Sequence, residues 1–360
     1  MRCRSALAAA AAAALAWACA PPASGAREGR AAGHAHHPRH GSVQAFLLVS
    51  SPDSLVDLRA HAAQVGVVYP TYFECQAPSG ALEGHDMPAV DAFARARGIV
   101  VMPRFNCQDG AIVHRLLTEP AVRAALLARL TAIARKPAFR GVCLDLENDG
   151  PGDRGALSSF VSDLARALHA HHRRLAVAVD GVTREGPGAP FAFYDDRALS
   201  AAADTVFVMA WGTHWAGSSP GPITNPSYVA GVVSFLKTLP NHSRFVIGAP
   251  MYGLDWATSG AVGQPLSSGR PAPIAAAYEF ERVRALARSV GAHATRDPAS
   301  RELTFAYTAP GGVAHRVWYM DAGAVLEVLR TARANGFKVG LWRLGTEDQS
   351  LWSSSLMGGR

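Results

Sequence analysis

Eight short apolar runs that alternate with longer stretches set the strongest limit on how this chain of 360 residues can fold. The runs cover residues 43–49, 66–69, 99–102, 141–145, 175–179, 205–209, 245–249 and 339–342. The clearest amphipathic stretches between them cover residues 121–135, 157–169, 228–239 and 322–334. Strands that are apolar along their whole length are typical of a parallel sheet buried on both faces. The alternation therefore predicts an α/β fold, a (β/α)8 TIM barrel over residues 42–360.

The seventh and eighth runs lie too far apart in the sequence to be joined by one helix. The segment between them opens with glycines and prolines, continues with a helical pattern at residues 275–290 and ends with β-like pieces at 303–307 and 315–319. We therefore expect a small α+β insertion between strands 7 and 8, over about residues 254–320.

The N-terminus has the parts of a secretory signal. Arg2 and Arg4 precede an unbroken apolar run over residues 6–18, and small residues and prolines follow. This run is too short to span a bilayer stably, and no other window of the sequence is apolar enough for a transmembrane segment. We expect a signal peptide over residues 1–19 and a secreted or cell-envelope protein. Cys19 follows a loosely lipoprotein-like sequence, which keeps lipidation open as the less favoured alternative to ordinary cleavage.

Residues 20–41 are rich in alanine, glycine, proline and arginine and contain a cluster of histidines. The histidines are His34, His36, His37 and His40. This composition predicts a disordered linker. Metal binding by the histidine cluster is the less favoured alternative.

The net charge of +7 is concentrated near the N-terminus. Residues 1–41 contain five arginines and one glutamate, so only +3 belongs to the rest of the chain. That part has no cluster of lysines and arginines, which argues against a nucleic-acid partner. It also lacks metal-ligand spacing and a glycine-rich phosphate loop, so we expect no metal and no cofactor. Nothing in the sequence requires a partner subunit, and we expect a monomer.

Three cysteines lie within the predicted barrel. Cys75 and Cys107 each fall just past a predicted strand, whereas Cys143 lies inside one. An oxidising compartment permits disulfides. A Cys75–Cys107 disulfide and two free thiols remain equally open alternatives, and we expect Cys143 to be a buried thiol.

Two carboxylates stand at the end of the fourth predicted strand. Side chains alternate along a strand, so Cys143, Asp145 and Glu147 share one face. Active sites of TIM barrels lie at the C-terminal ends of the strands. Like charges at this spacing raise at least one pKa, which suits a general acid at neutral pH. On spacing alone, salt-bridged acids at a solvated strand end explain the pattern equally well.

The same segment resembles the catalytic strand of glycoside hydrolase family 18, the chitinases and their relatives, whose pattern is Asp-x-x-Asp-x-Asp-x-Glu. Residues 204–215, 247–256, 317–319 and 340–345 are similar to the sixth strand, the seventh strand and the region of the eighth. The resemblance covers nearly all of residues 43–353. Within the family the chain is similar to the bacterial spore-cortex and cell-wall N-acetylglucosaminidase branch. The stretches similar to that branch are residues 70–72, 147–148, 214–215, 217–222 and 342–345.

The resemblance implies a secreted glycosidase that hydrolyses β-1,4-linked glycans containing N-acetylglucosamine, in peptidoglycan or chitin, with substrate assistance and retention. Glu147 matches the general acid/base, and Asp145 matches the aspartate that orients the substrate's acetamide. Trp211 stands where a tyrosine normally binds the acetamide oxygen. We expect the substrate to contact Tyr72, Phe105, Met209, Tyr252 and Trp342. Weaker sugar-contact candidates are Trp215 and Trp256, and Asp180 fits either a substrate contact or an Asp-Gly turn.

The chain departs from the family pattern at four positions. Arg140 and Cys143 replace the first two aspartates, Trp211 replaces the tyrosine, and Gly212 replaces the acid beside it. These departures favour the alternative of a catalytically impaired, chitinase-like carbohydrate-binding protein, whereas the intact Asp145 and Glu147 favour a hydrolase. The sequence leaves open the choice among chitin, peptidoglycan and glycoprotein glycans, and the choice between endo and exo action.

Overall fold

The computed structural model describes residues 41–76, 81–147, 150–185, 189, 191–258 and 275–358. The predicted signal peptide, nearly all of the predicted linker and the histidine cluster lie outside the described residues, so they stay predictions. No helix within the described residues is long and apolar enough to cross a membrane.

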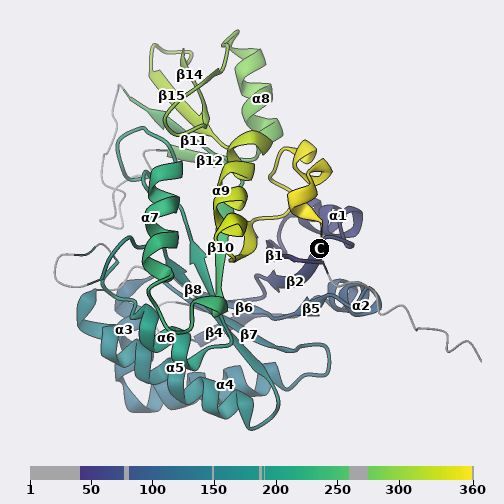
Figure 1. Cartoon of the computed structure of the whole chain (residues 1–360), viewed down its shortest axis with the longest axis vertical. Helices are drawn as coiled ribbons and strands as arrows, with labels where there is room; N and C mark the ends of the chain where they lie inside the picture. Colours follow the sequence, from purple (N-terminus) through teal and green to yellow (C-terminus); the bar gives the residue numbers. More distant parts are fainter. Residues whose placement is uncertain are drawn as a thin grey trace, which may run out of the picture. The chain divides into compact units, whose positions relative to one another are not determined.

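Parallel strands form the wall of a barrel (Figure 1). They are β1 (Val43–Leu47), β2 (Val65–Pro70), β3 (Phe73–Gln76), β5 (Val100–Val101), β6 (Arg104–Cys107), β7 (Gly141–Leu146), β8 (Arg174–Asp180), β9 (Thr205–Met209), β10 (Phe245–Pro250) and β16 (Lys338–Trp342). A short strand, β4 (Ala81–Gly84), pairs antiparallel with β3.

The second and third positions of the barrel are each split into two strands. β2 pairs with β1 and β5, whereas β3, which follows β2 after two residues, pairs with β6. Pro103 separates β5 from β6, and a proline cannot donate a backbone hydrogen bond to a sheet. β6 pairs with β7 and β16 pairs with β1, so the sheet runs round the barrel from β3 to β5. Its two edges are joined by the chain between β2 and β3 and between β5 and β6, and the Arg140 N–H before β7 donates to the Val101 carbonyl of β5 at 2.9 Å. The prediction of a TIM barrel is confirmed.

Helices follow the strands and cover the outside of the wall. They are α1 (Pro52–Ala60), α2 (Pro88–Ala96), α3 (Gly110–Thr118), α4 (Pro120–Ala134), α5 (Arg154–His169), α6 (Asp196–Ala202), α7 (Pro226–Leu236) and α9 (Ala322–Ala334), with 3-10 turns at Pro151–Asp153, His242–Arg244, Gln349–Ser353 and Ser355–Met357. Several begin at a proline or at a capping residue: Asn225, for example, accepts a hydrogen bond from the Tyr228 N–H at the start of α7.

An antiparallel sheet and one helix form the insertion between β10 and β16. The elements are β11 (Gly253–Ala257), β12 (Ala275–Tyr278), α8 (Phe280–Ser289), β13 (Thr295–Arg296), β14 (Leu303–Thr308) and β15 (Ala314–Tyr319). The prediction of a helix over residues 275–290 was wrong at its start. Residues 275–278 pair with β11, and this pairing overrides the helix propensity of three consecutive alanines.

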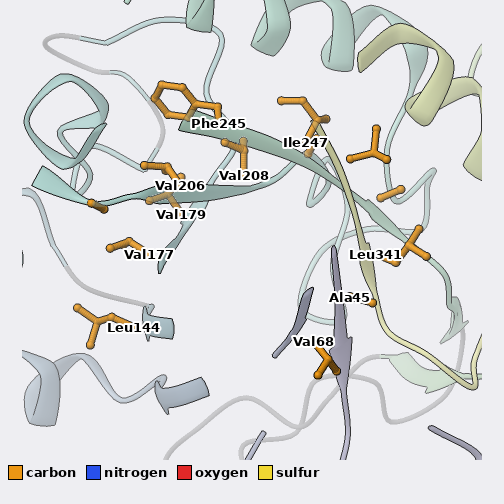
Figure 2. Packing of buried hydrophobic residues seen from close by; sticks show 14 of the residues in the cluster. Ala45, Val68, Leu144, Val177, Val179, Val206, Val208, Phe245, Ile247 and Leu341 are labelled. Carbon is orange, nitrogen blue, oxygen red and sulfur yellow. The ribbon is translucent and has the colours of Figure 1, made fainter. Parts of the chain in front are cut away.

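Alternation along the strands divides the core into an outer and an inner cluster. Figure 2 shows part of the outer cluster, in which Val206, Val208 and Ile247 face the helices. The inner cluster fills the barrel and consists of Phe46, Tyr69, Met102, Cys143, Ala176, Phe207, Met209 and Val246.

Three aromatic rings pack together inside the barrel. The Phe46 ring lies 5.0 Å from Tyr69 and 4.9 Å from Phe207, measured between ring centroids. Two glycines make room for them: a Cβ at Gly340 would lie 2.1 Å from the Phe207 ring, and one at Gly248 would lie 2.4 Å from it. The barrel is therefore filled beneath its C-terminal end.

Candidate active site

Strand register brings the two predicted carboxylates to the C-terminal end of the barrel. On one side of β7, Asn106 of β6 pairs with Asp145, and the Cys107 carbonyl accepts a hydrogen bond from the Glu147 N–H. Cys143 belongs to the inner cluster two residues below Asp145. Asp145 and Glu147 therefore face inward above a filled barrel.

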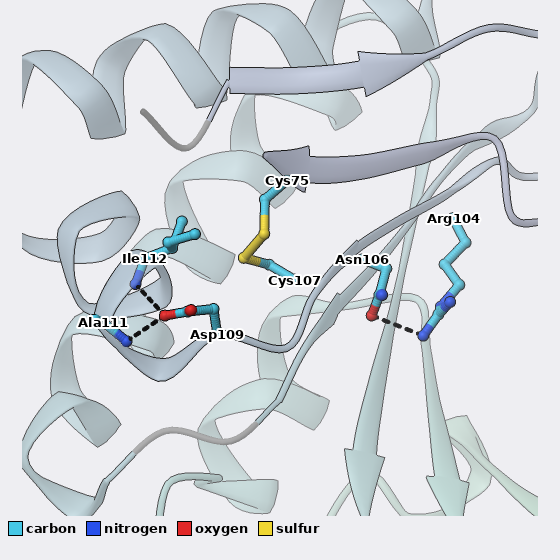
Figure 3. The surroundings of a disulfide bond; sticks show 7 residues. All are labelled: Cys75, Arg104, Asn106, Cys107, Asp109, Ala111 and Ile112. Atoms are coloured by element: carbon cyan, nitrogen blue, oxygen red, sulfur yellow. Dashed lines mark hydrogen bonds between the residues drawn. A yellow bond between two sulfur atoms is a disulfide. The ribbon is translucent and has the colours of Figure 1, made fainter. Parts of the chain in front are cut away.

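Asp145 is held by an arginine from the neighbouring strand. Arg104 donates from Nε to Oδ2 of Asp145. Figure 3 shows its second hydrogen bond, from Nη2 to Oδ1 of Asn106 at 2.7 Å. The Asp145 side chain is 2% exposed, and its Oδ1 has no hydrogen-bond partner among the described residues. A buried acceptor without a partner is costly, and this oxygen is able to accept a hydrogen bond from a donor group placed beside it.

Glu147 has the environment of a general acid. Gln108 donates from Nε2 to Oε1 of Glu147 at 2.7 Å, and Nη2 of Arg104 lies 3.6 Å from the same oxygen. Burial, followed by the negative charge of Asp145, raises the pKa of Glu147 to about 7, while Gln108 and Arg104 act in the opposite direction. Glu147 therefore retains its proton close to neutral pH.

Arg104 is the site residue that the sequence analysis missed. The third strand was predicted to end at Met102, but the third barrel position continues through β6 to Cys107. The charged residue between Pro103 and Phe105 was the available signal in the sequence, and the inward direction of its side chain follows from the observed register of Arg104 with Cys143.

A cleft of about 540 Å³ opens beside these groups. Its lining comprises Gln108, Trp215, Ala216, Tyr252, Leu254, Ala277, Tyr278, Glu279, Trp342, Arg343 and Thr346. Trp342 lies at the bottom, where its ring contacts Phe46 and stands 5.0 Å from the Arg104 guanidinium. Tyr252 and Trp342 thus lie where the sequence analysis expected sugar contacts, and Trp215 is 60% exposed at the rim.

The β9 end differs from the family pattern in a way that the backbone explains. Met209 lies in the inner cluster, and Trp211 is half-buried against both clusters. Gly212 has φ +90, and its N–H donates to the Ile223 carbonyl at 2.9 Å. An aspartate at position 212 would be strained at this positive φ, so the backbone conformation after β9 explains why a glycine stands there.

Three expected substrate contacts do not line the cleft: Met209, which is buried in the inner cluster, Tyr72 and Phe105. Tyr72 is buried outside the barrel, where its hydroxyl donates to Asp91 of α2 at 2.8 Å. Phe105 faces the outer cluster because its neighbours Arg104 and Asn106 face inward. These two predictions were wrong because the splits in the second and third strands change which side chains point inward. Trp256 is also fully buried and unavailable to a sugar.

The departures at Arg140, just before β7, and Cys143, within β7, lie at opposite depths of the barrel. Arg140 is exposed at the opposite mouth of the barrel, where it lines a pocket with Arg174 and Lys338. It is therefore remote from Glu147. Cys143 is a fully buried free thiol, and burial raises its pKa well above the usual value.

A disulfide joins Cys75 of β3 to Cys107 of β6 (Figure 3). It lies immediately before Gln108. On the other side of Gln108, Asp109 caps α3 by accepting hydrogen bonds from the Ala111 and Ile112 N–H groups. The residue that contacts Glu147 is therefore fixed on both sides. No group of metal-ligating side chains that could hold an ion occurs among the residues described.

Comparison with known proteins finds a similar solved structure and similar sequences. A chitinase from Chromobacterium violaceum ATCC 12472 has a similar structure, with a TM-score of 0.73 and 26% identity over 87% of this chain and 97% of that one. The glycosylase YvbX of Bacillus subtilis is 23% identical over 68% of this chain and 69% of its own length. The cortical fragment-lytic enzyme of Bacillus anthracis is 24% identical over 66% of this chain, which spans 54% of that relative.

A family model also matches most of the chain. The model described as "Glycosyl hydrolases family 18" matches residues 94–346, which include β7, the Arg104 strand and the cleft. The sequence-based assignment to this family is confirmed, and a cortical fragment-lytic enzyme is among the similar proteins. The chain belongs to glycosyl hydrolase family 18.

Proposed function

We propose that this protein is a glycosidase that cleaves β-1,4 linkages following N-acetylglucosamine, with the substrate's acetamide as nucleophile and with retention. One observation carries the proposal. Glu147, whose pKa is raised to about 7, stands two residues after a buried Asp145 whose Oδ1 awaits a donor. This arrangement supplies a proton donor and an acceptor for an acetamide N–H beside the cleft, next to its lining residue Gln108.

In the first step, Glu147 donates its proton to the glycosidic oxygen as the C1–O bond breaks. The acetamide oxygen forms a new bond to C1, and the positive charge spreads over the resulting oxazolinium ring. Oδ1 of Asp145 accepts the acetamide N–H, and its negative charge stabilises the ring. Arg104 holds the other oxygen, so the carboxylate is oriented before the substrate arrives.

In the second step, the ionised Glu147 accepts a proton from water. The water oxygen bonds to C1 from the face that the leaving group occupied, and the bond to the acetamide oxygen breaks. Gln108 keeps the Glu147 carboxyl in place through its hydrogen bond to Oε1. Trp342, at the bottom of the cleft, provides a flat surface for the sugar ring.

The substrate class and the location are part of this proposal. Relatives are named as a chitinase and as cortical fragment-lytic enzymes, which supports chitin-type glycans and peptidoglycan as the substrates to test. The apolar run over residues 6–18 supports secretion, with Cys19 as an alternative lipid attachment point.

One observation favours a second function. Trp211 offers an indole N–H where the family pattern has a tyrosine hydroxyl, and Gly212 removes a carboxylate. A protein weakened at these positions would bind glycans without cutting them.

Incubation of the full chain with N-acetylglucosamine oligomers and with purified peptidoglycan, followed by mass spectrometry, tests both functions. We expect new reducing ends from the wild type and none from Glu147→Gln, while oligomer binding persists in both. Glu327→Gln, an equivalent change on the surface of α9, should behave as the wild type does. Saturable binding without products by all three proteins would establish the binding function instead.

A further inference from the structure

A third carboxyl group lies beside Glu147. Register between β7 and β8 pairs Cys143 with Ala176 and Leu144 with Val177. The same spacing, continued by three residues, places Asp180 level with Glu147. Cys143 and Ala176 both belong to the inner cluster, so the alternation points Asp180 inward as well.

The Asp-Gly turn after β8 does not explain why an aspartate stands at position 180. The Gly181 N–H donates to the Met209 carbonyl at 3.0 Å, and the Gly181 carbonyl accepts from the Tyr228 hydroxyl at 2.6 Å. The backbone groups of the turn are thus satisfied without the Asp180 side chain. On the other neighbouring strand, β9, its register partner is the apolar Met209.

Electrostatics around Asp180 favour its neutral form. The charged and titratable groups nearby are Asp145 and Glu147 on β7, Tyr194 before α6, Tyr228 on α7, and Arg104 on β6, which contacts both β7 carboxylates. Burial, then the charges of Glu147 and Asp145, raise the pKa of Asp180 to about 8. The hydroxyls of Tyr194 and Tyr228 donate to the backbone carbonyls of Leu146 and Gly181. Arg104 is engaged by Asp145 and Asn106.

We propose that Asp180 is a positioning residue for Glu147, a neutral carboxylic acid whose O–H donates a hydrogen bond to the Glu147 carboxylate formed when the leaving group takes its proton. This proposal rests on the proposed function. No proton is transferred between the two residues: the Asp180 O–H bond stays intact while the Glu147 proton moves to the glycosidic oxygen. The hydrogen bond offsets the second negative charge that would otherwise accumulate beside Asp145.

Asp180 stands at the end of β8, next to the strand whose end carries an acid in the family pattern. Gly212 follows β9, where the family pattern has an acid, and β9 pairs directly with β8. This chain therefore has a carboxyl group at the end of β8, as Asp180, and none at position 212 after β9, where the family pattern has one. Loss of a positioned donor typically lowers kcat on the order of a hundredfold.

Steady-state kinetics over a range of pH, with the full chain and an N-acetylglucosamine oligomer, test the role. Asp180→Ala should lose kcat by about a hundredfold with little change in KM. Asp180→Asn keeps an N–H donor and should retain most of kcat. Above neutral pH the wild-type rate should fall as two protons are lost, and the Asp180→Asn rate as one is lost. Asp163→Asn, on the outer face of α5, is the matched control.

Two kinetic results would overturn the proposal: wild-type kcat in Asp180→Ala, or an Asp180→Asn enzyme as slow as Asp180→Ala. Infrared spectra provide a readout that needs no activity. Because Glu147, Glu302 and Glu347 also have raised pKa values and contribute protonated-carboxyl absorption, the comparison uses difference spectra at pH 7. The difference between wild type and Asp180→Asn should contain a protonated-carboxyl band that the difference between wild type and Asp163→Asn lacks, and its absence from the first difference would also refute the proposal. If the wild type releases no product, the proposed hydrolase function fails, while the infrared comparison still decides the state of Asp180.

Discussion

Arg104→Met tests whether the arginine organises the site. The change keeps an unbranched apolar side chain in the barrel but removes the partner of Asp145, whose side chain is 2% exposed. Removing one member of a buried ion pair costs about 3–5 kcal/mol, so the free energy of unfolding should fall by roughly that amount. We expect kcat to fall at least a hundredfold, because Asp145 loses the group that orients it.

The pH dependence of Arg104→Met should also move in a defined direction. Arg104 lowers the pKa of Glu147 across 3.6 Å, a separation at which unit charges attract by about 1 kcal/mol in water and about 5 kcal/mol at an effective dielectric constant of 20. Without the arginine, the pKa of Glu147 rises, and its acid form persists to higher pH. The basic limb of the pH–rate profile should therefore move upward by about one pH unit or more.

Urea unfolding and pH–rate profiles of Arg104→Met and Arg123→Met provide the comparison. Arg123 pairs with Asp163 on the surface, where loss of an ion pair costs at most about 1 kcal/mol. Equal stability losses in the two variants, together with an unmoved basic limb, would refute the assigned role of Arg104.

Two further predictions concern the scaffold. Replacing both Cys75 and Cys107 by serine opens a loop of 32 residues, so urea unfolding should show a loss of about 3–4 kcal/mol, and a loss below about 1 kcal/mol would contradict a stabilising disulfide. Gly340→Ala places a Cβ 2.1 Å from a ring carbon in the barrel interior and should lower the free energy of unfolding by about 1–3 kcal/mol. Gly155→Ala, whose Cβ would meet nothing within 4 Å, is its control, and equal stability of the two alanine variants would count against the tight fit.

The sequence predicted the barrel well because its signal is repeated along the chain. Each apolar run marks a strand buried on both faces, and each run has an observed counterpart. The insertion was placed correctly, but its first strand was assigned to a helix. Alanine favours helices locally, whereas the pairing of residues 275–278 with β11 depends on contacts that a single segment cannot reveal.

The site was predicted less completely because side-chain direction depends on continuous strands. Asp145 and Glu147 follow an unbroken strand, and the alternation oriented them correctly. The splits at the second and third barrel positions interrupt this alternation, so the direction of a side chain cannot be counted along one continuous strand. They send Tyr72 and Phe105 outward and Arg104 inward, and only the observed register reveals this.

The packed rings inside the barrel limit how water reaches the cleft. Phe46, Tyr69 and Phe207 are at most 1% exposed and contact one another across the barrel, so solvent has no passage from the opposite mouth. In the proposed reaction, the water that completes hydrolysis would then enter from the cleft, by the route through which the first sugar product departs. If the protein acts as proposed, an alcohol that enters the space vacated by that product would compete with water for the same reactive carbon. When that alcohol is a sugar, the result is transfer to the sugar in place of hydrolysis. The ratio of the two products would then depend on how quickly the first product leaves the cleft.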